Sequence, residues 1–237
     1  MASTMLLRQE DSTAVPQLRI YTGTHRIDRF LGGFFSAHLY HATGSVSLVQ
    51  TICTMLMVQT VQQFNGDILF LDGSNTIDPY AIAQYARAQQ SDADHVLTHI
   101  KVARAFTAYQ LDTLIHHIPR YVEEFTPLLV IVNGITDLLH DTDVGQQEGE
   151  TLLRRWLTHI KQQADRHSHV ALVTSRAHSP FTQLCQRYAD HALSCEHRGT
   201  ACVIKVDGQG QRLQYQPVPV SQATIDDFME DVPWAEP

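Results

Sequence analysis

The stretch AHLYHATGSVSLVQTICTMLMVQTVQQFNGDILFLD, residues 37–72, decides the fold. A short apolar segment at 37–42 precedes residues 47–64, whose apolar side chains would lie around most of a helical circumference. Such a helix is usually buried against a sheet. An Asn-Gly pair ends it, and 67–72 is a continuous apolar run of the kind found in buried parallel strands. The stretch therefore predicts a strand–helix–strand unit.

The rest of the chain continues this alternation. Helices are predicted at 78–90, 107–118, 145–167 and 181–189, and strands at 99–105, 127–133 and 169–175. Three final segments, 191–198, 201–207 and 212–218, are separated by glycine-containing turns, which is typical of an antiparallel meander. Strand–helix alternation of this kind predicts an α/β fold with a doubly wound, mostly parallel sheet and an antiparallel C-terminal meander.

Length and composition predict one globular domain, because 237 residues of which 43% are hydrophobic can bury a sizeable core. We expect an N-terminal extension at 1–17, a core domain at 18–220 and an acidic-aromatic tail at 221–237. No apolar run approaches the roughly 18 residues of a membrane span, and the first residues lack the pattern of a secretory signal. A cytoplasmic location without membrane contact is the expectation.

Charge and metal-ligand patterns exclude two classes of function. The chain has 17 basic and 25 acidic residues, and its last 16 residues hold five acidic and no basic ones. Tight binding to a nucleic-acid backbone needs clustered Lys and Arg, so we expect weak or no direct DNA binding. The four cysteines form no C-x-x-C pair and the 14 histidines make no zinc-like spacing, so no metal site is expected.

Four segments carry a resemblance to a known family. TGTHRIDRFLGGFFSAHLYHATGS (22–45) resembles the entry to the core ATPase domain of RecA/RadA-type recombinases. The segments at 67–87, 99–111 and 128–139 resemble, in the same order, the strands and helices that follow in that family. The resemblance covers roughly residues 18–216. It implies a RecA-like fold of the P-loop ATPase type, in a protein similar to the short recombinase paralogs that consist of the core alone.

The resemblance also implies a phosphate-binding loop at 41–48. The Walker A pattern G-x-x-x-x-G-K-[ST] uses glycines to wrap the phosphates, a lysine to neutralise them and a hydroxyl to hold Mg²⁺. Here the two glycine positions are His41 and Val46, the lysine position is Ser47 and the hydroxyl position is Leu48. Gly44 and Ser45 lie between them. All four chemical positions have changed, so the Walker A motif is degenerate.

The Walker B motif is degenerate too, and so is the position of the catalytic glutamate that the family implies. Asn133 stands where the Walker B aspartate is expected, and Ser74 where a catalytic glutamate is expected. Asp72 is the remaining candidate carboxylate. Several independent losses are hard to compensate, because each missing charge-assisted contact costs a few kcal/mol. We expect no ATP hydrolysis and no bound cofactor, with weak binding of ATP or ADP at the following helix N-terminus as the alternative.

The leading hypothesis is a non-catalytic recombinase paralog, a pseudo-ATPase that acts as an accessory subunit in DNA repair or recombination. Its expected partner is a catalytic recombinase paralog or another repair protein, or a second copy of the chain. Two alternatives stay open. The chain could be a divergent nucleotide-binding ATPase of the same superfamily, or a RecA-fold scaffold with no role at DNA.

The tail at 221–237 combines acidic residues with aromatic ones. A purely solvating tail would not need aromatic side chains. We predict that Phe228 and Trp234 carry any tail contact, because buried aromatics dominate interface energetics. Two interpretations remain: the tail docks on its own core, or it binds a partner.

Overall fold

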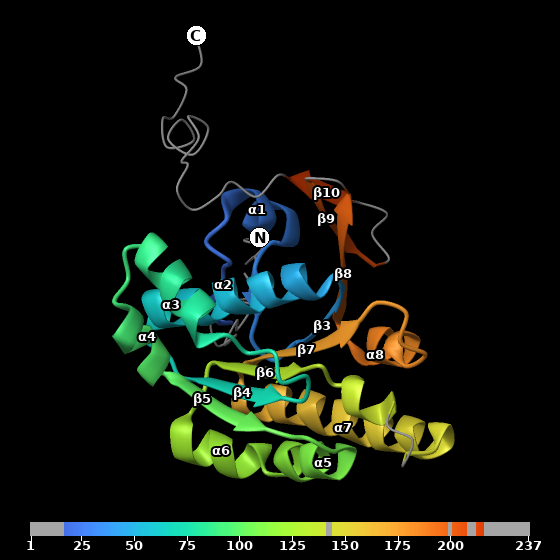
Figure 1. Ribbon diagram of the computed structural model, residues 1–237. Coiled ribbons are helices and arrows are strands. Elements are labelled where there is room, and N and C mark those ends of the chain that lie inside the picture. Colours follow the sequence, from blue (N-terminus) through green and yellow to red (C-terminus); the bar gives the residue numbers. More distant parts are fainter. Residues whose placement is uncertain (1–16, 141–143, 199–200, 208–211, 216–237) are drawn as a thin grey trace, which may run out of the picture.

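Figure 1 shows a computed structural model, which describes residues 17–140, 144–198, 201–207 and 212–215. Its main sheet has the strand order β10-β9-β8-β3-β7-β6-β4-β5. The strands are β3 (Leu39–Gly44), β4 (Ile68–Asp72), β5 (Ile100–Arg104), β6 (Leu129–Asn133), β7 (Val170–Arg176), β8 (His191–Arg198), β9 (Ala201–Val206) and β10 (Arg212–Tyr215). Strands β8, β3, β7, β6, β4 and β5 pair in parallel, and β8, β9 and β10 form an antiparallel meander. The predicted fold class is confirmed.

Helices cover both faces of this sheet (Figure 1). One face carries α2 (Val46–Phe64), α3 (Pro79–Ala88) and α4 (Ala93–Thr98), and the other carries α5 (Ala108–His116), α6 (Ile118–Phe125), α7 (Gln146–His167) and α8 (Thr182–Tyr188). Each face has its own hydrophobic core. The remaining elements are a two-strand ladder of β1 (Arg19–Ile20) and β2 (Phe34–Phe35), helix α1 (His25–Leu31), and the 3₁₀ helix η1 (Asp137–His140).

The helix predicted at 107–118 is present as α5, and a second helix, α6, follows it directly and has no counterpart among the predicted elements. The first ends at His116, and the second begins at Ile118 with Pro119 in its first turn. Proline favours that position because it has no N–H to donate. Helix α4 was not predicted; its N-cap Asp92 accepts hydrogen bonds from the backbone N–H groups of Asp94 and His95.

The parallel register brings the carboxyl ends of four strands together. Asp72 of β4 lies opposite Asn133 of β6, and Thr43 of β3 lies opposite Ser175 of β7. The polar residues that follow these strands therefore meet at one edge of the sheet. This edge is where ligands bind in open α/β folds.

Several predictions fall on parts of the chain outside the described residues. They include most of the N-terminal extension and the whole tail with Phe228 and Trp234, so the tail contact stays a prediction. Within the described residues, no helix is both long and apolar enough to cross a membrane.

Candidate functional site

The junction between β3 and α2 has no room for a phosphate-wrapping loop. Strand β3 continues through His41 to Gly44, and α2 begins at Val46, so Ser45 alone connects them. Gly44 has a φ of 126°, and a Cβ there would lie 2.0 Å from the carbonyl oxygen of Cys195. Only glycine fits this close approach of β3 to β8. The interpretation of residues 41–48 as a loop is therefore wrong: 41–44 are strand and 46–48 are helix.

The side chains from this stretch point to different places. His41 is fully buried, and its Nε2 lies 2.8 Å from the Oγ of Ser175. Burial lowers the pKa of His41 to about 4, so the ring is neutral at neutral pH. Leu48 is buried in the core under α2. Ser47 is exposed, and its Oγ lies 3.1 Å from the Nε2 of His197. These side chains do not converge on one ligand.

Asp72 is surrounded by donors from its own chain. Its carboxylate is fully buried, and Asn133 donates to it from Nδ2 at 3.0 Å. The backbone N–H groups of Thr76 and Ile77 also donate to it, at 3.4 and 3.2 Å. The guanidinium of Arg104 lies 3.8 Å away on the outer side. Its charge is thus compensated within the protein.

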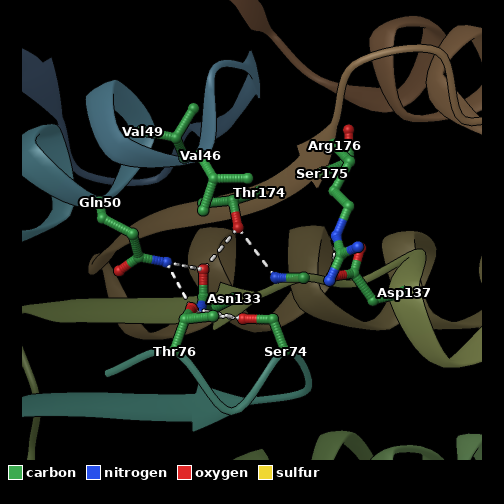
Figure 2. A pocket seen from close by; sticks show the side chains of 11 residues that line it. Val46, Val49, Gln50, Ser74, Thr76, Asn133, Asp137, Thr174, Ser175 and Arg176 are labelled. Atoms are coloured by element: carbon green, nitrogen blue, oxygen red, sulfur yellow. Dashed lines mark hydrogen bonds and ion pairs between the residues drawn. The ribbon is translucent and has the colours of Figure 1, made fainter. Parts of the chain in front are cut away.

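Asn133 is the centre of a closed hydrogen-bond network (Figure 2). Its Oδ1 accepts from the Nε2 of Gln50 at 2.9 Å and from the Oγ1 of Thr174 at 2.8 Å, which fills both lone pairs. Its Nδ2 lies 2.6 Å from the Oγ of Ser74 and 2.9 Å from the Oγ1 of Thr76. Gln50 also donates to Thr76, at 2.8 Å. The Walker B position is therefore occupied by a fully satisfied amide.

A cleft opens beside this network. Its empty volume is about 310 Å³, including the part open to solvent, and Val46, Gln50 and Asn133 are among its lining residues. On its other side, Arg176 donates from Nε to Oδ2 of Asp137 at 2.9 Å (Figure 2). Burial raises the pKa of Asp137, and the charge of Arg176 opposes that rise. The cleft therefore lies between the Asn133 network and this ion pair.

These residues do not fit a magnesium nucleotide. Binding the phosphates needs a lysine and a loop of backbone N–H groups, and holding the metal needs a hydroxyl and a free carboxylate. Here the N-terminus of α2 offers N–H groups without the loop or the lysine. The oxygens of Asp72 already accept internal hydrogen bonds. Asp137 across the cleft is paired with Arg176 through Oδ2, and its Oδ1 is buried without a hydrogen-bond partner among the described residues. In the described part of the chain, no three His, Cys, Asp or Glu side chains come together as metal ligands.

Sequence reasoning identified Asp72 and Asn133 but missed Gln50 and the two threonines, Thr76 and Thr174. The helical period gives a signal for Gln50, because it lies four residues after Val46 on the same face of α2. Thr174 is the third-last residue of β7, next to β6. Its place at a polar strand end is the signal that could have identified it.

Comparison with known proteins agrees with the fold. A model of the Rad51 family matches residues 15–191. The meiotic recombination protein DMC1/LIM15 homolog of Homo sapiens is 25% identical over 169 residues, which are 66% of this chain and 50% of that protein. The chain thus spans about half the length of this curated relative. Because the family model matches well over half of its residues, the chain belongs to the Rad51 family.

Proposed function

We propose that this protein is a non-catalytic member of its family that acts as an accessory, partner-binding subunit in DNA recombination or repair. The observation that carries the proposal is the closed network in which Gln50 and Thr174 saturate the amide oxygen of Asn133. A site that binds Mg²⁺ and phosphate needs free ligand atoms, and here the Walker B position is an amide whose oxygen already has two partners within the chain. The family membership and the meiotic recombination relative support the role in recombination or repair.

The first test is nucleotide turnover by the full chain. We expect no Mg-ATP hydrolysis above background, with or without single-stranded DNA, and no rise in melting temperature with ATP or ADP. Ser47→Ala is a suitable probe of any residual rate, because Ser47 is exposed and its removal should leave the fold intact. Turnover that copurifies with the protein and falls in the Ser47→Ala variant would instead support a divergent ATPase.

Weak DNA binding belongs to the same proposal. The segment between β7 and α8 contains only residues 177–181, and Arg176 before it is already paired with Asp137. Phosphate contacts need several available cations. We expect micromolar or weaker binding of single-stranded DNA near physiological salt, measured by fluorescence anisotropy. Nanomolar binding by the isolated chain would contradict this part of the proposal.

A partner surface is available at the far edge of the sheet. Strand β5 is the terminal strand, so its outer backbone groups pair with no other strand in the described residues. Val102 on this strand is 46% exposed, and Phe106 just after it is 66% exposed. An open strand edge with apolar side chains is a template for strand addition by another polypeptide. We propose that β5 is where a partner recombinase or repair protein adds a strand.

Association can be tested with purified proteins. The full chain is mixed with the catalytic recombinase of the same organism, and complex formation is followed by sedimentation velocity. A complex that forms equally well without added nucleotide supports the proposal, because a site that does not bind nucleotide cannot use it to join two subunits. If the chain neither self-associates nor binds the recombinase, the result would favour a scaffold without a role at DNA.

A further inference from the structure

A second hollow lies between α5 and α7, on the outer side of the helix layer. Its empty volume is about 560 Å³, including the part open to solvent, and it shares no lining residue with the cleft at the strand ends. The lining residues are His116, Arg154, Arg155, Thr158, His159 and Gln162. Each of them has a polar side chain, and four of them can carry positive charge. This composition stands out in a chain with a net charge of −8.

Arg155 is held in position by Asp112 of α5. The Oδ1 of Asp112 accepts from Nη2 of Arg155 at 2.6 Å and from Nε1 of the fully buried Trp156 at 2.7 Å. A guanidinium has five N–H donors in a rigid plane, so this pair leaves Arg155 with donors for a ligand. The buried indole fixes the carboxylate, which in turn fixes the direction of the guanidinium.

Arg154 is held only weakly. Its Nη2 lies 3.8 Å from Oε2 of Glu150, and both side chains are nearly half exposed. Exposed pairs of this kind contribute little stability, so the guanidinium of Arg154 is available to a stronger acceptor. Two guanidinium groups on successive residues of α7 therefore lie at the same hollow.

The two histidines lie beside the guanidinium groups at the hollow. The Nδ1 of His116 lies 2.7 Å from the backbone carbonyl oxygen of Asp112, which can only accept, so Nδ1 carries the proton. The ring stacks on His159 with centroids 5.4 Å apart. The Nε2 of His159 is buried and has no hydrogen-bond partner among the described residues. A buried polar atom without a partner is costly, so a ligand or rearrangement that engages it is favoured.

We propose that this hollow binds a phosphate group, held by Arg154 and Arg155 with Gln162 and the histidines beside them. The two guanidinium groups and the Gln162 amide offer N–H donors and positive charge, which suit an oxyanion. Paired guanidinium groups match the several oxygens of a phosphate better than a point charge would. The hollow is open to solvent, so a phosphate can enter it together with the group that bears it, either a small phosphomonoester or a phosphorylated side chain of a protein.

The full chain is titrated by calorimetry with three probes: inorganic phosphate, O-phosphoserine and a phosphoserine peptide with its unphosphorylated form. We expect saturable binding of at least one phosphate-bearing probe. Arg154→Ala should weaken it by about tenfold or more, as expected for the loss of a charge-assisted hydrogen bond. Arg187→Ala is the matched control, because Arg187 is an exposed arginine on α8 outside the hollow.

Two comparisons separate the sources of the phosphate. Tighter binding of the phosphopeptide than of phosphoserine identifies a phosphorylated protein, and equal affinity identifies a small phosphomonoester. A melting curve of Arg154→Ala verifies that the variant is folded, and Arg154→Lys should recover part of the affinity. The proposal is overturned if no phosphate probe binds saturably, or if Arg154→Ala and Arg187→Ala bind the probes with the same affinity. It is also overturned if the unphosphorylated peptide binds as tightly as the phosphorylated one.

Discussion

Two regions of the sheet differ in how their polar groups are paired: the carboxyl ends of β4 and β6, and the outer edge of β5. At the strand ends, Asp72 and Asn133 have their hydrogen bonds filled by residues of the same chain. At β5, the outer backbone groups pair with no strand in the described residues, and Val102 and Phe106 stay exposed. The region where the family's chemistry is expected is closed on itself, while the region suited to association is open.

This difference separates two kinds of experiment. A change at the closed network removes internal hydrogen bonds, so its main effect should be on the free energy of unfolding. A change at the open edge removes nothing internal, so its main effect should be on association. The predictions below run from the largest expected effect on stability to the smallest.

Asn133→Asp should have the largest effect. The new carboxylate would face Asp72 across about the present 3.0 Å contact, without the Nδ2 donor that now joins them. An uncompensated buried charge costs about 3–5 kcal/mol in the free energy of unfolding. Urea unfolding measures this loss relative to the parent protein.

The exposed Gln147→Glu variant, in the first turn of α7, controls for the added charge, and it should change stability little. The loss in Asn133→Asp should shrink in mildly acidic solution, because two adjacent carboxylates then share a proton. An Asn133→Asp protein as stable as the parent would show that the network is not closed.

Acidification of the parent protein should have the next largest effect. Burial lowers the pKa of both His41 and His169 to about 4, below the value of about 6.5 for an exposed histidine. Between about pH 6.5 and pH 4 the unfolded chain therefore binds more protons than the folded chain. The free energy of unfolding falls as the pH drops below about 6.5, and the loss levels off near pH 4. At about pH 5.5 each histidine should cost about 1.4 kcal/mol relative to about pH 7.5.

Urea unfolding at the two pH values measures this difference. The lowered pKa values of His159 and His191 act in the same direction. The raised pKa of Asp137 acts in the opposite direction, because the folded state then holds its proton more tightly than the unfolded state. His169→Gln, which cannot take up a proton, should reduce the pH dependence. A stability that stays flat between the two pH values would mean that these rings reach solvent.

Gln50→Ala should have a moderate effect. It removes the donor to Asn133 and Thr76 and leaves the Asn133 oxygen with one partner in place of two. We expect a loss of about 1–2 kcal/mol, since a buried acceptor is left partly unsatisfied. Gln147→Ala, at an exposed position of α7, is the matched control for the substitution itself. Equal unfolding midpoints for the two variants would argue that the Gln50 contacts contribute nothing.

The sequence predicted the sheet better than it predicted the site. Apolar runs place β4 and β6, and parallel pairing then puts Asp72 beside Asn133 without further information. The contact of Gln50 with Asn133 joins residues 83 positions apart, and it depends on how α2 packs on the sheet. The true end of β3 depends on β8, whose Cys195 carbonyl accepts from the backbone N–H of Ser45 at 2.7 Å. Both contacts join residues far apart in the sequence, so local sequence patterns do not predict them.

The motif alignment itself produced the error at His41. A family motif treats 41–48 as one loop, so a strand histidine was interpreted as a changed glycine. Its burial and its hydrogen bond to Ser175 follow from the pairing of β3 with β7. The predicted strand at 37–42 already contained His41, and a central strand covered on both faces places each of its side chains in the core.

Val102→Lys should have the smallest effect on stability and a large effect on association. The side chain is 46% exposed, so its replacement should change the free energy of unfolding by less than about 0.5 kcal/mol. A lysine on an edge strand opposes the approach of another strand, so the complex with a partner should weaken strongly. Val46→Lys is the matched control, because Val46 is 48% exposed and lines the cleft beside the Asn133 network. Sedimentation velocity of both variants with the same partner decides between the regions. If Val46→Lys abolishes the complex and Val102→Lys does not, the partner interface lies at the strand ends and not at the outer edge of β5.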